Sequence, residues 1–87
     1  MYDSMPVLMN ANKDTVFTDY PDLIKNNSIR YTLFTPSGEF VIGFETKSGS
    51  GCQIIMTTSL STSPIPVIKA RLKYNGNWLA EKTLSFT

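Results

Sequence analysis

The pattern that most constrains the fold is a series of short β-favouring segments, separated by turn residues, that occupies residues 29–87. Segments rich in Ile, Val, Phe, Tyr and Thr that recur about every 8–12 residues indicate an all-β domain. The connecting turns, such as Pro36-Ser37-Gly38-Glu39 and Asn75-Gly76-Asn77, are too short to join parallel strands. They predict an antiparallel meander of five strands: Ile29–Thr35, Phe40–Thr46, Cys52–Leu60, Val67–Tyr74 and Trp78–Phe86.

We therefore predict a mainly β fold, in which this small antiparallel meander curls into a barrel or half-barrel within a single domain over residues 1–87. Alternate residues of a strand face opposite sides of its sheet, so each predicted strand has an apolar row. A single sheet must curl or be covered to bury that row. The expected core is this one apolar face: Tyr31, Leu33, Ile42, Phe44, Ile54, Met56, Ile68, Ala70, Leu72, Trp78, Leu84 and Phe86.

The register of the first hairpin follows from its loop. A four-residue loop at 36–39, with proline at the second position of a β-turn, opposes Tyr31 to Phe44 and Arg30 to Glu45. This register gathers apolar side chains on one face and pairs opposite charges at the same time. A three-residue loop would instead oppose Arg30 to Phe44, so we predict the four-residue loop.

The register of the last hairpin has two alternatives. A two-residue turn at Asn75-Gly76 is the commonest form for this dipeptide, but it pairs Lys73 with Trp78. We predict a three-residue loop, which pairs Tyr74 with Trp78. This register leaves Lys82 on the apolar face, so we also expect a strand end or a bulge near it.

The N-terminal third is less regular, and we expect at most one short helical turn in it. Pro21 suits the first position of a helical turn at residues 20–25. The N–H group at that position makes no hydrogen bond within a helix, so proline, which has no N–H, loses nothing there. Thr15–Thr18 predicts a short strand.

The apolar run Met5-Pro6-Val7-Leu8-Met9 contains proline and predicts an extended arm at residues 1–9. One alternative is that the arm is the first strand of this domain and closes the edge of the sheet. The other is that it leaves its subunit and adds to the sheet or groove of a neighbour. Met5, Val7, Leu8 and Met9 are therefore candidate partner-binding residues.

Residues for catalysis are scarce. The chain has no histidine, and Cys52 is its only cysteine. General acid–base and nucleophilic catalysis draw mostly on histidine, paired carboxylates or an activated thiol, and a closed zinc site needs four nitrogen or sulfur ligands. The loop Lys47–Gly51 has its lysine before the glycines, unlike a phosphate-binding loop. We expect no enzyme activity, no metal site and no cofactor.

One basic stripe is present. Alternation places Lys69, Arg71 and Lys73 on the same face of one strand. Such a stripe could contact the phosphates of a nucleic acid, but the net charge is only +1 and no aromatic platform is interleaved with the stripe. These three residues are candidates for partner binding.

We therefore expect a non-catalytic binding or structural module, such as a small accessory or assembly protein of a virus or phage, acting through protein–protein contacts. A protein partner or a homo-oligomer is expected, because an 87-residue chain with one cysteine has no disulfide to support a small core. The alternative is a small β-barrel that binds nucleic acid through Lys69, Arg71 and Lys73. Without a secretory signal at Met1–Ser4 or a long apolar run, we expect no membrane contact and a cytoplasmic or virion-associated protein.

Overall fold

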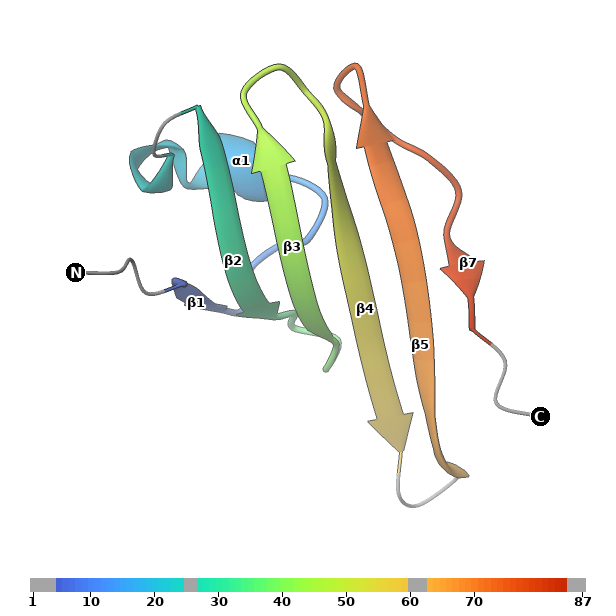
Figure 1. Cartoon of the computed structure of the whole chain (residues 1–87). Helices are drawn as coiled ribbons and strands as arrows, with labels where there is room; N and C mark the ends of the chain where they lie inside the picture. Colours follow the sequence, from blue (N-terminus) through green and yellow to red (C-terminus); the bar gives the residue numbers. More distant parts are fainter. Residues whose placement is uncertain (1–4, 25–26, 60–62, 85–87) are drawn as a thin grey trace.

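The computed structural model describes residues 5–24, 27–59 and 63–84, and within these ranges it contains one twisted sheet of seven strands (Figure 1). Four strands, β2 to β5, form an antiparallel meander, β1 lies parallel to β2 at one edge, and β6 and β7 both pair with β5. The strands are β1 (Val7–Met9), β2 (Ser28–Phe34), β3 (Phe40–Thr46), β4 (Gly51–Ser59), β5 (Ser63–Tyr74), β6 (Asn77–Trp78) and β7 (Lys82–Thr83).

The mainly β, largely antiparallel fold is confirmed. The sheet is open, because no pairing between described strands joins β1 to β6 or β7. It therefore twists without closing into a barrel, and α1 (Val16–Asp19) and η1 (Pro21–Leu23) lie behind it (Figure 1). The predicted fifth strand, Trp78–Phe86, is divided into the two short strands β6 and β7, and its last residues lie outside the described part of the chain.

The helical turns differ partly from expectation. The turn at residues 20–25 is confirmed as η1, with Pro21 in its first turn. The prediction of a short strand at Thr15–Thr18 is wrong, because α1 occupies this place. The segment therefore contains α1 in addition to the one helical turn that we expected. The helical conformation is compatible with the packing of Val16, which is fully buried against the sheet. Thr15 Oγ1 also donates a hydrogen bond to Asp19 Oδ2 at 2.7 Å across the turn.

The core lies between the sheet and this N-terminal segment. Its buried apolar residues are Leu8, Ala11, Val16, Ile29, Tyr31, Leu33, Val41 and Ile55. Tyr31 and Leu33 belong to the predicted core as well, but most other predicted core residues point to the opposite side of the sheet. Those are Ile42, Phe44, Ile54, Met56, Ile68, Ala70 and Leu72, while Phe86 lies outside the described residues.

The predicted register of the first hairpin is wrong by one residue. Tyr31 lies opposite Gly43, and Arg30 lies opposite Phe44. The loop is the three-residue one, in which the Thr35 N–H donates to the carbonyl of Glu39 at 2.9 Å. A shift of one residue exchanges the two faces of a strand, so the predicted alignment assigned the correct side of β2 but the wrong side of β3 to the core.

Tyr31 explains the observed register. Its ring lies over Gly43, where a Cβ would overlap the ring, so the glycine provides the space that the tyrosine occupies. Its hydroxyl donates a hydrogen bond to Glu45 Oε2 at 2.5 Å on the same face. The loop permits this alignment because Gly38 adopts φ 89°, a left-handed conformation that glycine accepts without strain.

The last hairpin is a composite of the two alternatives. Asn75-Gly76 forms a two-residue turn with φ values of 55° and 85°, and Lys73 lies opposite Trp78, so the three-residue loop is wrong. Further along, Ala70 lies opposite Lys82, which is the pairing that the longer loop implied. The register thus shifts by one residue between β6 and β7, and the expected irregularity near Lys82 is confirmed.

Candidate functional site

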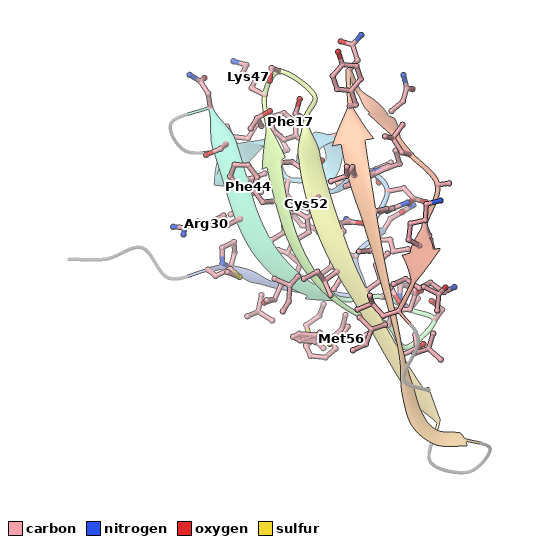
Figure 2. All side chains as sticks on the ribbon, turned by 45° about the vertical axis from the view of Figure 1, so that its right-hand side comes forward. Phe17, Arg30, Phe44, Lys47, Cys52 and Met56 are labelled. Atoms are coloured by element: carbon pink, nitrogen blue, oxygen red, sulfur yellow. The ribbon has the colours of Figure 1, made fainter. Side chains whose placement is uncertain are left out.

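The sheet has two faces of different character. Residues 11–24 lie over the side chains of one face, which we call the covered face. We call the opposite face, on which neither α1 nor η1 lies, the open face. Figure 2 shows Phe44 of β3 and Cys52 and Met56 of β4 on the open side of the sheet and Phe17 behind it.

A polar network occupies the covered face. Besides the bond from Tyr31, the carboxylate of Glu45 accepts a hydrogen bond from Lys73 Nζ at 2.8 Å. Gln53 Nε2 donates to the hydroxyl of Tyr31 at 2.7 Å. Burial raises the pKa of the Tyr31 phenol well above its ordinary value, and its hydrogen bond to Glu45 raises it further. The phenol therefore stays protonated and acts as a structural donor.

Arg71 extends this network to the N-terminal segment. Its Nε donates to Gln53 Oε1 at 2.8 Å, and its Nη2 donates to Asp14 Oδ1 at 2.6 Å. The guanidinium also lies 4.1 Å from the centre of the Trp78 ring, and the indole N–H donates to the carbonyl of Asp14 at 3.1 Å. The segment around Asp14 is thereby attached to β4, β5 and β6.

The members of this network are largely buried and bonded to one another. Glu45 is fully buried and Arg71 is 8% exposed. In the described part of the chain, every buried side-chain nitrogen or oxygen has a hydrogen-bond partner. The groups therefore satisfy one another's hydrogen-bonding capacity, which accounts for their position inside the fold.

The predicted basic stripe is part of the covered face. Lys69, Arg71 and Lys73 share one side of β5, as alternation predicted, but this is not a free cationic surface. Arg71 and Lys73 contact carboxylates within the network, and Lys69 Nζ lies 3.8 Å from Glu81 Oε2. The charge available to phosphates at this stripe is correspondingly small.

The N-terminal arm pairs with its own chain, since β1 lies beside β2 in parallel orientation. Leu8 points into the core and is 9% exposed. Val7 and Met9, which are 60% and 63% exposed, lie beside Thr32 and Phe34 and extend the open face past β2. Met5 is also exposed. The arm therefore divides its candidate residues between the core and the open surface.

The open face is apolar across β3, β4 and β5. At its centre, Ile54 is 45% exposed and Leu72 is 59% exposed, and Ile42 and Phe44 on β3 are each more than one third exposed. These side chains are exposed to an extent that is unusual for the middle of a sheet. Across β3, β4 and β5 the open-face residues are Phe40, Ile42, Phe44, Cys52, Ile54, Met56, Ile68, Ala70, Leu72 and Tyr74.

A groove of about 460 Å³ lies in this face between β4, β5 and the connection that leads to β7. Its lining includes Ile54 on β4, Leu72 on β5, and Leu79, Ala80 and Lys82. The surface of the groove is mostly apolar.

Sequence reasoning found most of these residues but assigned them to the core. The information that separates the two faces lies in the polar residues. Glu45, Gln53, Arg71 and Lys73 alternate with the apolar row, and Asp14 supplies a further charge for them. A set of opposite charges on one side of adjacent strands indicates that this side, too, can be buried.

Among residues 5–24, 27–59 and 63–84, no three His, Cys, Asp or Glu side chains are grouped so that they could hold a metal ion. No helix in these ranges has the length and apolar character needed to cross a membrane. Comparisons of the chain with known protein families, curated proteins and solved structures find no match.

Proposed function

We propose that this chain is a non-catalytic module that binds a protein through the open face of its sheet. The observation that supports the proposal is the continuity of exposed apolar side chains from β1 to β5. Seven large apolar side chains of this face are each 37–63% exposed, and a contiguous exposed apolar surface on a monomer often marks a binding site. They are Val7, Met9, Phe34, Ile42, Phe44, Ile54 and Leu72.

The chemistry of the face favours a protein over a nucleic acid. Its central strands present no charged side chain, while Arg71 and Lys73 are engaged on the other side of the sheet. Phosphate binding relies on accessible cations, whereas the centre of a protein interface is apolar and poor in charge. The same surface suits an assembly component, such as an accessory protein of a virus or phage particle, in which small β units bury apolar faces against their neighbours.

Cys52 provides a way to test the proposal, because it is the only cysteine of the chain and is exposed on the open face. A photo-reactive benzophenone maleimide attached to this thiol should form covalent protein adducts after irradiation in an extract of the expressing cells. The added substitution Ile54→Glu should abolish the adducts, because it places a charge in the apolar centre.

A matched control uses Val67, which is 39% exposed and lies on the same side of β5 as Lys69 and Arg71. The double variant Cys52→Ser, Val67→Cys carries the same label on the opposite side of the sheet. Few adducts are expected from it. Equal adduct yields from the two positions, or none from Cys52, would contradict the proposal.

A further inference from the structure

We infer that the protein bound on the open face is a second copy of this chain. This inference rests on the proposed function and specifies the partner. The two open faces would pack against each other as the inner layers of a β-sandwich, in which two sheets lie about 10 Å apart with interdigitated side chains. The covered faces, with α1 and η1, would form the outside of the dimer.

The open face has the exposed apolar side chains that a dimer would bury. The seven named above are each 37–63% exposed, and Tyr74 and Leu79, which are 68% and 49% exposed, add to them. A specific interface is apolar at its centre and has aromatic residues enriched there. Two copies in contact would therefore bury an interface made mostly of apolar surface.

The charges of the chain also permit self-association. The net charge is +1, so two copies repel each other only weakly. On the open face, Arg30 lies on β2 and Lys82 on β7, and the side chains that β3, β4 and β5 place on this face between them are uncharged. A two-fold dimer places the same patch on both sides of the interface, and such a patch is self-complementary when its centre is apolar and uncharged.

The architecture of one copy supports the same conclusion. A sheet with apolar side chains on both faces requires a layer on each side, and in this fold the short N-terminal segment covers only one of them. The chain has a single cysteine and hence no internal disulfide, so it lacks a common support of small domains. A second copy supplies the missing layer, and it is present wherever the protein is made.

The test combines mass with the reactivity of Cys52. Sedimentation equilibrium of the purified protein gives the oligomeric state and the dissociation constant, and the rate of maleimide labelling reports whether the open face is accessible. At a concentration 100 times the dissociation constant, about 7% of the chains stay monomeric by mass action. Labelling of Cys52 is then expected to slow about fifteenfold relative to dilute protein.

Two matched variants complete the experiment. Ile54→Glu is expected to weaken dimerisation by about 100-fold or more and to keep Cys52 labelling fast, because each interface would bury two unpaired carboxylates. Val67→Glu makes the same kind of change on the other side of the sheet and should leave both measurements unchanged. Circular dichroism verifies that each variant keeps its sheet.

Wild-type protein that stays monomeric at all concentrations, with Cys52 freely reactive, would overturn the inference without the use of any variant. A dimer in which Cys52 remains fully reactive would also overturn it, because the copies would then meet through another surface. The proposed function is tested separately by adducts in cell extract. If those adducts contain a different protein while the purified chain stays monomeric, the proposed function survives and the second-copy inference fails.

Discussion

Gly43→Ala tests the central geometric claim about the fold, namely that Tyr31 determines the register of β2 and β3. A Cβ at residue 43 would meet three atoms of the tyrosine, Cζ, Cε2 and Oη, at distances that real atoms do not adopt. Tyr31 is fully buried, and its hydroxyl is hydrogen bonded to Glu45 and Gln53. The ring therefore has no room to withdraw without losing those bonds.

The expected magnitude follows from these contacts. Overpacking a closed core costs about 1–3 kcal/mol. Displacement of the Tyr31 hydroxyl from the carboxylate of Glu45 costs about 1.5–3 kcal/mol more, as for hydrogen bonds to charged groups. Replacing glycine by alanine in a strand recovers about 0.5–1 kcal/mol. We expect a net loss of about 2–5 kcal/mol, a large part of the roughly 4–13 kcal/mol available to a chain of 87 residues.

The assay is urea unfolding followed by circular dichroism at one low protein concentration, because self-association would raise the apparent stability. A double-mutant cycle gives the control. In a Tyr31→Leu background the ring is absent, so Gly43→Ala should cost less than about 1 kcal/mol or become favourable. If Gly43→Ala cost the same in both backgrounds, or stabilised the protein that carries Tyr31, the proposed role of this pair would be refuted.

Two further predictions concern the covered face. Glu45→Gln leaves the Lys73 ammonium without its carboxylate and should lower the free energy of unfolding by about 2–4 kcal/mol, with partial recovery when Lys73→Met is added; an unchanged urea midpoint would show that the ion pair contributes nothing. The pKa of Tyr31 is raised in the folded state, so its contribution to stability is complete below the ordinary tyrosine value of 10.0 and is lost as the pH rises above it. Above this pH, the free energy of unfolding should fall by up to about 1.4 kcal/mol per pH unit, and this fall should be absent from Tyr31→Phe. Equal slopes of the free energy of unfolding against pH in the two proteins would contradict the prediction.

Much of the local structure could be predicted from residue types. The range Phe40–Thr46 coincides with β3, and Pro21 correctly marked a helical turn. Alternation also predicted that Ile42, Ile54 and Leu72 share one face of the sheet. These features depend on neighbours in the sequence, because strand periodicity and turn preferences are set within a few residues.

The candidate site was predicted only in part. Val7 and Met9 were selected as partner-binding residues, and the structure places them on the open face beside β2. The apolar centre of that face was assigned to the core, and Arg71 was assigned to a basic stripe that could bind a partner. Both errors have the same cause. The prediction took the apolar side of β3, β4 and β5 as the buried side, whereas the N-terminal segment covers the other side.

Residue types alone determined a meander of β-strands with one apolar and one mixed face, because alternation and turn chemistry act locally. The tertiary structure decided which of these faces became the interior. The choice of interior depends on the loop between β2 and β3, which is one residue shorter than predicted, and on the fit of Tyr31 over Gly43. It also depends on the ion pair between Arg71 and Asp14, which lie 57 residues apart in the sequence. Contacts between such distant residues form only when the chain is folded, and a shift of one residue in a strand reverses its faces without changing its local pattern.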